Sequence, residues 1–276
     1  MRIDAHQHFW DVSRFNYPWM PPSPSVLRRS YLPSHLRPIL ERNRFDGCVA
    51  VQANTVLEET HWLLSLAADH DFIKAVVGWV DLADPSVGDT LDQLQKHPKF
   101  KGVRHPVQDE PDEGWLVREG VLRGLAELAR RGIPYDLLLY PRHLPLVPRI
   151  LERVQGLRVV IDHIAKPPIA SGRLDRWATD ISAAAKYPNV WSKLSGMITQ
   201  ADHNWKAADL RPYVSHVLEC FGFDRLMFGS DWPVCLTAGT WKEVLAGFTQ
   251  ALGAQPVGLR EKLLGLNACE FYGIGR

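Results

Sequence analysis

Short apolar runs rich in β-branched and aromatic residues alternate with longer amphipathic stretches along the whole chain. The runs are nearly continuous in hydrophobicity, which is typical of strands buried on both faces of a parallel sheet. Eight strand-then-helix repeats predict an α/β fold, a (β/α)₈ TIM barrel. The expected strands are residues 2–6, 47–53, 75–81, 100–105, 134–140, 157–163, 189–195 and 225–231.

A doubly wound open sheet is the alternative that this alternation leaves. Its common nucleotide-binding signatures are missing, because no G-x-G-x-x-G follows the first run and no G-x-x-x-x-G-K occurs. Helical periodicity is clearest over 58–70, 118–132, 210–222 and 259–273. The Pro-rich stretch "YPWMPPSPS" (17–25) is the longest irregular segment, and we expect it to form a long loop over the barrel mouth. No linker is visible, so residues 1–276 are predicted to form one domain.

Polar and titratable residues gather at the carboxyl ends of the predicted strands. The first strand ends in "HQH", and residues i and i+2 of a strand point to the same face, so His6 and His8 should aim at one point. In this fold the site lies at the carboxyl ends of the strands. The other strand ends contribute Gln52, Asn54, Trp79, Arg104, His105, Tyr140, His163, Lys193, Asp231 and Trp232.

Composition narrows the class of protein. The chain has 276 residues, 46% of them hydrophobic, and a formal net charge of +1, so no strong field favours nucleic acid or a membrane surface. No apolar run of 18 residues and no signal-peptide pattern is visible. The four scattered cysteines fit reduced thiols. We therefore expect a cytoplasmic protein with a small-molecule partner, and leave open whether it is a homo-oligomer.

Five motifs carry a resemblance to a known superfamily. "DAHQHFW", "GVRHPVQDEP", "VIDHIAKP", "KLSGMIT" and "FGSDWPVC" occur in this order, each at a strand end. Together they resemble the amidohydrolase superfamily, and more narrowly its lactone-hydrolysing branch of L-fucono-1,5-lactonases, L-rhamnonolactonases and 2-pyrone-4,6-dicarboxylate hydrolases. The resemblance spans residues 2 to about 273 and implies hydrolysis at the barrel mouth, with the sugar lactonases most similar.

The same resemblance supplies a set of metal ligands, and four residues match it: His6, His8, His163 and Asp231. A bridging lysine or carboxylate after the fourth strand and a histidine after the fifth do not appear, which argues against a two-metal centre. One divalent cation, such as zinc or manganese, suits imidazole and carboxylate ligands. A metal-free site in which these imidazoles bind the substrate carbonyl stays open as well.

A lactone is an activated ester, so its hydrolysis needs a base for water and a stabiliser for the oxyanion. We expect Asp231 to be the general base, and His163 with His6 and His8 to polarise the carbonyl. The expected substrate-binding residues are Gln52, Asn54, Trp79, Arg104, His105, Tyr140, Lys193, Trp10 and Trp232, the tryptophans packing against the sugar ring.

Several other functions compete with this one. A serine lactonase is disfavoured because no G-x-S-x-G is present. A pyrone-dicarboxylate hydrolase needs several cations, which can come from Arg104, Arg142, Lys166 and Lys193. A decarboxylase on the same fold normally needs a firm metal site, against which the missing fifth-strand histidine counts. A non-catalytic binding barrel predicts the loss of a rim residue, and the rim is intact.

Overall fold

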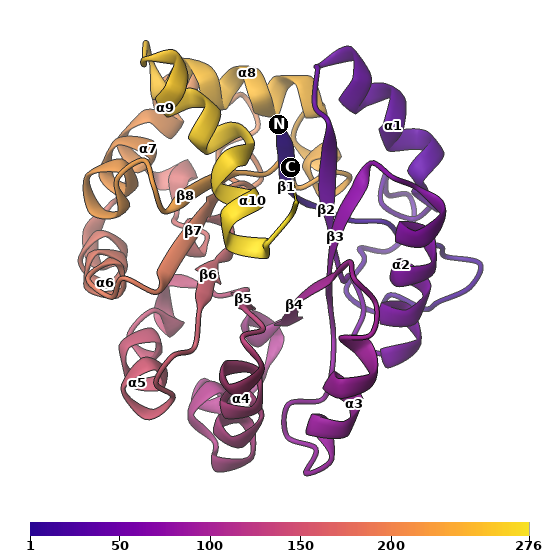
Figure 1. The fold of residues 1–276 in the computed structure, drawn as a ribbon. Helices are drawn as coiled ribbons and strands as arrows, with labels where there is room; N and C mark the ends of the chain where they lie inside the picture. The colour runs from indigo at the N-terminus through magenta and orange to yellow at the C-terminus, as the bar shows by residue number, and fades with distance from the viewer. Residues whose placement is uncertain (276) are drawn as a thin grey trace.

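Eight parallel strands in the order β1 to β8 form a barrel wall in the computed structural model, which describes residues 1–275 (Figure 1). A bridge between Gln7 and Trp232 joins the last strand to the first, and His8 N donates to the Trp232 carbonyl at 2.7 Å. The predicted (β/α)₈ barrel is confirmed. The strands are β1 (Ile3–Gln7), β2 (Gly47–Val51), β3 (Ile73–Gly78), β4 (Phe100–His105), β5 (Tyr135–Leu137), β6 (Val159–Ile161), β7 (Val190–Leu194) and β8 (Leu226–Phe228).

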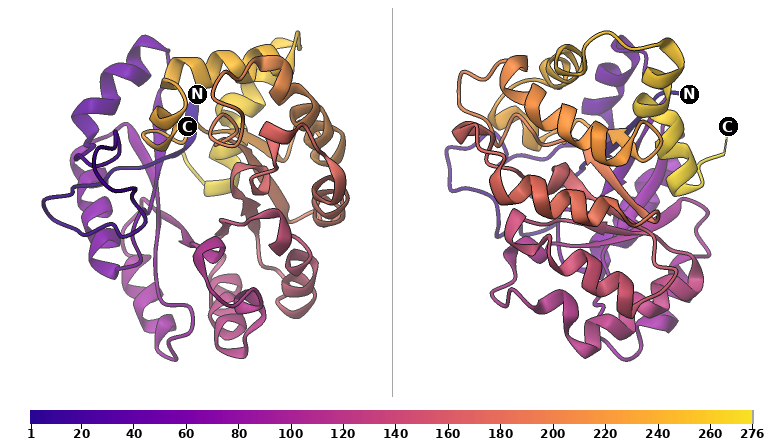
Figure 2. Two further views of the ribbon diagram at one scale, coloured as in Figure 1. Left: turned by 180° about the vertical axis from the view of Figure 1, so that it is seen from behind. Right: turned by 90° about the vertical axis from the view of Figure 1, so that its left-hand side faces the viewer.

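Helices follow the strands and surround the barrel (Figures 1 and 2). Their amphipathic faces pack on the outer side of the sheet, where most of the buried apolar side chains lie. The helices are α1 (Pro33–Arg42), α2 (Leu57–Asp69), α3 (Val87–Leu94), α4 (Glu119–Arg131), α5 (Leu146–Arg153), α6 (Asp175–Ala185), α7 (Ala207–Phe221), α8 (Trp241–Leu252), α9 (Val257–Glu261) and α10 (Asn267–Tyr272).

Two groups of predicted elements differ from the structure. Strands β5, β6 and β8 are shorter than expected, because their polar ends leave the sheet to form the site. The single helix expected over 259–273 is divided into α9, a π-helical turn over Lys262–Leu266, and α10. Gly265 lies at this interruption against β1, where a Cβ would come within 2.4 Å of the Met1 carbonyl oxygen.

The Pro-rich stretch lies in the long connection between β1 and α1, as the sequence predicts. Two backbone hydrogen bonds close the base of this loop: Trp10 N–H donates to the Tyr31 carbonyl at 3.0 Å, and Tyr31 N–H donates to the Trp10 carbonyl at 2.8 Å. Trp19 Nε1 donates to the Ala53 carbonyl at 2.7 Å, which fastens the loop to the segment after β2. The loop lies on the same side of the barrel as α1 and α2 (Figure 2).

The barrel interior changes character from one end to the other. Near the amino ends of the strands it is apolar, with Ile3, Val49 and Ala75 among the side chains of one buried cluster that also includes residues of α10. Towards the carboxyl ends buried charged groups replace them. Over the described residues, none of the helices is both long and apolar enough to cross a bilayer. The cytoplasmic location and the number of subunits stay predictions.

Candidate active site

A cavity of about 650 Å³ opens at the carboxyl ends of the strands. Its floor contains His8, His163 and Asp231, which come from three different strand ends. Polar groups and apolar groups both contribute to the walls. The remaining lining residues are Pro18, Trp19, Gln52, Ala53, Asn54, Thr55, Arg104, Pro106, Gln108, Asp109, Leu138, Tyr140, Lys166 and Val234.

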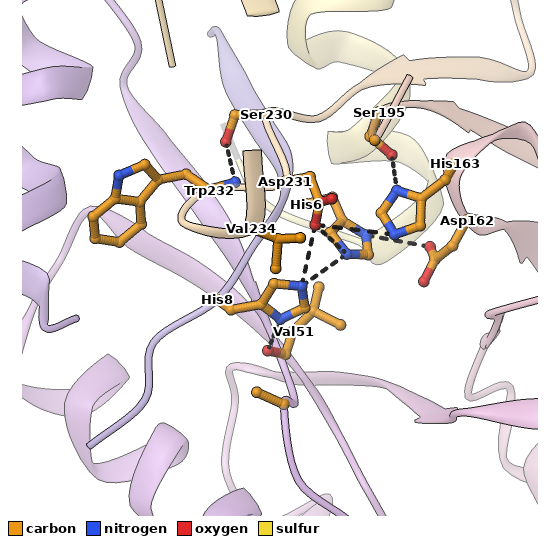
Figure 3. A network of polar contacts seen from close by, with 12 residues as sticks. His6, His8, Val51, Asp162, His163, Ser195, Ser230, Asp231, Trp232 and Val234 are labelled. Atoms are coloured by element: carbon orange, nitrogen blue, oxygen red, sulfur yellow. Dashed lines mark hydrogen bonds and ion pairs between the residues drawn. The ribbon is translucent and has the colours of Figure 1, made fainter. Parts of the chain in front are cut away.

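Three imidazoles surround one carboxylate at the floor of this cavity (Figure 3). The Oδ1 atom of Asp231 lies 3.4 Å from His8 Nε2, 3.8 Å from His6 Nε2 and 4.0 Å from His163 Nε2. The two Nε2 atoms of His6 and His8 are 3.2 Å apart. All four side chains are almost fully buried. The structure therefore brings these four residues together as predicted, but His6 lies below the floor and is not among the residues that line the cavity.

The closure of the barrel brings Asp231 to this point. Its backbone N–H donates to the His6 carbonyl at 2.8 Å, directly linking the end of β8 to β1. Asp231 has φ +56°, in the left-handed region that non-glycine residues rarely adopt. Such strained residues persist where the surrounding structure fixes them, and they cluster at active sites. The geometry thus turns the carboxylate inward rather than along the strand.

Hydrogen bonds on the far side of two rings fix their orientation. His8 Nδ1 lies 2.8 Å from the Val51 carbonyl, which only accepts, so His8 carries its proton on Nδ1 and directs the Nε2 lone pair into the site. His163 Nδ1 lies 2.8 Å from Ser195 Oγ (Figure 3). A second ring contact of this kind orients imidazoles in metal and catalytic sites.

Burial sets the charge state of the group. It lowers the pKa of His163 to about 4, and it also lowers the pKa values of His6 and His8. Burial alone would raise the pKa of Asp231, but the facing imidazoles outweigh it and hold that pKa well below its usual range. At neutral pH the site therefore contains an ionised carboxylate among three neutral imidazoles.

A left-handed turn presents His163. Residues 163–166 all have positive φ, between 47° and 58°, although none of them is glycine. Trp177 Nε1 donates to the Ile164 carbonyl at 2.7 Å and holds the turn from outside. Gly196 leaves room for the ring, because a Cβ there would lie 2.6 Å from His163 Nδ1.

A buried layer of charges supports the site from inside the barrel. Lys193 Nζ contacts Asp136 Oδ2 at 2.5 Å and Asp162 Oδ1 at 3.0 Å, and it lies 3.1 Å from His6 Nδ1. Arg104 Nη1 also contacts Asp162, at 3.1 Å. Each buried cation thus has a carboxylate partner, which makes the burial of both charges tolerable.

The other predicted substrate-binding residues divide into two sets. Gln52, Asn54, Arg104 and Tyr140 line the cavity. The structure places the remaining five behind its walls, as supports for the site: Trp10, Trp79, His105, Lys193 and Trp232.

Each of these supporting residues has partners outside the cavity. Trp10 is fully buried and donates to the Arg29 carbonyl at 2.7 Å. Trp79 Nε1 donates to His105 Nδ1 at 3.0 Å. The His105 ring stacks on Trp115 with 4.0 Å between centroids. Trp232 packs edge-on against Tyr31 and Phe9.

Sequence reasoning missed Trp19, Gln108 and Asp109 as lining residues, and considered Lys166 only as a cation for the pyrone alternative. Trp19 is 41% exposed and belongs to the Pro-rich loop expected over the barrel mouth, so its place in that loop could have identified it as a lining residue. Lys166 follows the "DHIA" motif directly. Gln108 lies in the "PVQDEP" stretch after the fourth strand.

The site contains a set of potential metal ligands. His6, His163 and Asp231 each offer a donor atom, and these atoms lie within 4.8 Å of one another. Within residues 1–275 this is the one such group of three or more side chains. Two imidazoles and a carboxylate match the ligands of Zn²⁺, and His8 lies beside them. The donor set therefore fits a divalent cation.

Comparison with known proteins identifies the family of this chain. The Amidohydrolase family model matches residues 3–274. The chain belongs to the amidohydrolase family. An L-fucono-1,5-lactonase of Burkholderia ambifaria is 39% identical to this amidohydrolase over 282 residues, covering 100% of this chain and 96% of the relative. An L-fucono-1,5-lactonase of Burkholderia multivorans is 40% identical over 255 residues, or 88% and 86% of the two chains.

Solved structures add a zinc-containing neighbour of this amidohydrolase. A crystal structure of an amidohydrolase from Burkholderia multivorans with bound zinc is 37% identical, covers 100% of both chains and has a TM-score of 0.92. A probable 2-pyrone-4,6-dicarboxylic acid hydrolase from Acinetobacter baumannii has a TM-score of 0.82 at 19% identity, with 99% of each chain covered. At that identity the likeness concerns the fold alone.

Proposed function

We propose that this chain hydrolyses the ring ester of a sugar-acid lactone similar to L-fucono-1,5-lactone. The observation that carries the proposal is the ionised Asp231 at the floor of the cavity, with the neutral imidazoles of His8 and His163 beside it and that of His6 below. Such a group offers a base and polarising neighbours without a serine nucleophile. The two curated relatives of about 40% identity are L-fucono-1,5-lactonases, which supports this substrate class.

The charges around the cavity favour a neutral, hydroxylated ring over a dicarboxylate. Of the four cations that could serve the pyrone alternative, Lys193 is fully buried below the floor. Arg142 stays outside the lining, with a side chain that is 47% exposed and paired with Glu113. Arg104 and Lys166 line the cavity, but Asp231 and Asp109 line it too.

Arg104 is already engaged by other groups. Its Nε donates to Gln52 Oε1 at 2.8 Å, its Nη2 to the Gln52 carbonyl at 2.5 Å, and its Nη1 contacts Asp162. Little of its donor capacity is left for a substrate carboxylate. A dicarboxylate would therefore lose its hydration without gaining two paired cations, which is costly in free energy.

In the reaction that we propose, Asp231 removes a proton from water as the water oxygen attacks the lactone carbonyl. The imidazole of His163 lines the floor beside Asp231 and polarises the carbonyl oxygen, which becomes the oxyanion. The His6 ring is fully buried below the floor and supports Asp231 from there. The carboxylic acid of Asp231 then returns the proton to the ring oxygen as the ester C–O bond breaks. The product is an open-chain hydroxy acid, and Asp231 is ionised again.

A divalent cation fits the same residues. His6, His163 and Asp231 would hold it, and it would act as a Lewis acid that polarises the carbonyl and acidifies water. The bound zinc in the 37% identical neighbour supports this assignment. The His8 side chain is fixed by the Val51 carbonyl and would help to hold the Asp231 carboxylate, 3.4 Å away, in position.

A pH-indicator assay of the purified protein tests the function. The substrates are a panel of aldono-1,4- and 1,5-lactones together with 2-pyrone-4,6-dicarboxylate, each with and without chelator. We expect acceleration of at least one aldonolactone and a much lower kcat/KM for the dicarboxylate. Absence of any acceleration over the buffer rate across the lactones would contradict the proposal. A higher kcat/KM for the dicarboxylate would instead favour a 2-pyrone-4,6-dicarboxylate hydrolase.

A further inference from the structure

Lys166 reaches the cavity from the same left-handed turn as His163. Lys166 N donates to the His163 carbonyl at 2.8 Å, and both side chains line the cavity. A left-handed conformation is unfavourable for a non-glycine residue. The four successive residues with positive φ therefore represent a considerable strain. One result of this strain is that an ammonium group lies beside the catalytic imidazole.

Gln108 holds this ammonium group in place. Lys166 Nζ donates to Gln108 Oε1 at 2.6 Å, and it lies 5.4 Å from the centre of the Tyr140 ring. The Gln108 backbone is itself fixed, because its N–H donates to the Leu138 carbonyl at 3.1 Å and its carbonyl accepts from Arg142 at 3.3 Å. The amide oxygen thus presents the lysine to the cavity from a firmly held position.

Lys166 differs from Arg104 in the donors it has left. Arg104 uses Nε, Nη1 and Nη2 on Gln52 and Asp162. An ammonium group has three N–H donors. Within the described residues, the hydrogen bonds of Lys166 Nζ end at Gln108 Oε1, and no carboxylate forms an ion pair with it. Two donors are therefore left for a ligand at the cavity that Lys166 lines, which we assign to a hydroxylated ring.

We propose that Lys166, positioned by Gln108, donates hydrogen bonds to the ring hydroxyl groups of the lactone and so determines specificity for polyhydroxylated substrates. The proposal rests on the proposed function. It assigns recognition of the sugar hydroxyls to a residue three positions beyond His163, while the chemistry at the carbonyl stays with Asp231 and the imidazoles. It also gives the left-handed turn a role, since the turn places Lys166 and His163 at the same cavity.

The test compares two lactones in one variant. Lys166→Met keeps an unbranched side chain and the same backbone requirement but removes every donor. On L-fucono-1,5-lactone we expect kcat/KM to fall by about 10- to 150-fold, as for the loss of a hydrogen bond to a charged group. On δ-valerolactone, which has no hydroxyl groups, kcat/KM should change by less than about threefold, since only hydroxyl contacts are lost. Where δ-valerolactone is not turned over, its inhibition constant replaces kcat/KM.

Three further variants complete the design. Lys242→Met changes the same charge on the exposed face of α8 and should leave both substrates unaffected. Lys166→Arg retains donors and should recover part of the loss. Gln108→Leu removes the amide oxygen that accepts the hydrogen bond from Lys166, and it should reduce kcat/KM on the hydroxylated lactone alone. This variant tests the proposed role of Lys166 even if Lys166→Met does not fold.

Equal losses on the two lactones, or no loss on the hydroxylated one, would overturn the proposal. If the wild-type protein accelerates neither lactone, the proposed function itself fails. The two failures are therefore distinguishable.

Discussion

Replacing Asp231 with asparagine tests the proposed chemistry with little change in shape. The side chain is 5% exposed, and its Oδ1 faces three imidazole nitrogens at 3.4 to 4.0 Å. Asn has nearly the same volume but neither the charge nor the basic oxygen. Asn also tolerates the left-handed φ of +56° better than most residues, so the backbone should keep its path.

The expected loss is large for turnover and small for stability. A general base contributes about 10²–10⁴-fold, which corresponds to about 2.7–5.4 kcal/mol at 1.36 kcal/mol per factor of ten. Because burial keeps the imidazoles neutral at pH 7, with the pKa of His163 at about 4, no cation loses its partner. The free energy of unfolding should therefore change by no more than about 1.5 kcal/mol, as for one buried hydrogen bond.

The assay measures kcat and KM for L-fucono-1,5-lactone, with thermal unfolding as the check on folding. Asp71→Asn, on an exposed residue after α2, is the matched control and should behave as wild type. We expect kcat for Asp231→Asn to fall at least about 100-fold while Tm changes little. A kcat within about threefold of wild type, in a folded variant, would refute the role of Asp231 as the base.

Three other predictions concern the surroundings of the site. Zn²⁺ added at 100 times its Kd to chelator-treated protein should stabilise it by about 2.7 kcal/mol in a thermal-shift assay. His163→Ala should abolish that shift, and the absence of any Zn²⁺-induced shift in the wild-type protein would contradict the metal assignment. Gly196→Ala should reduce kcat/KM, because its Cβ would lie 2.6 Å from His163 Nδ1. The control Gly132→Ala has a φ of +67° and open space around it, so it should lose stability but not activity; equal activities of the two variants would refute the steric argument. Burial raises the pKa of Glu59 to about 7 from 4.5, so the stability supplied by its protonated form is lost as pH rises between these values. Glu59→Gln should flatten the decrease in Tm between about pH 5 and pH 7, and an unchanged slope over that range would contradict this.

The fold and the core of the site follow from the sequence for simple reasons. A strand buried on both faces needs continuous apolar residues, and eight such runs are visible. The i, i+2 spacing of His6 and His8 required a shared face, and the closure of β8 beside β1 brings Asp231 to that face. These features depend on local pattern and on the topology of one fold.

The support of the site could not be predicted in the same way. Tryptophan fits a buried wall as well as a cavity mouth, so Trp10 and Trp232 could not be told from Trp19 by residue type. No glycine marks the left-handed turn of residues 163–166, which tertiary contacts impose. Lys193 lies on a strand that the sequence places correctly, but only the structure separates the rim from the buried layer below it.

Proton NMR of L-fucono-1,5-lactone with the purified protein tests the central claim most directly, because it follows the lactone and the open-chain acid as separate species. With wild-type protein we expect the lactone signals to be replaced by those of the hydroxy acid orders of magnitude faster than in buffer. With Asp231→Asn the rate should approach the buffer rate. If wild-type protein and buffer give the same rate for this lactone and for the other aldonolactones, the account of this site as a sugar-lactone hydrolase is contradicted.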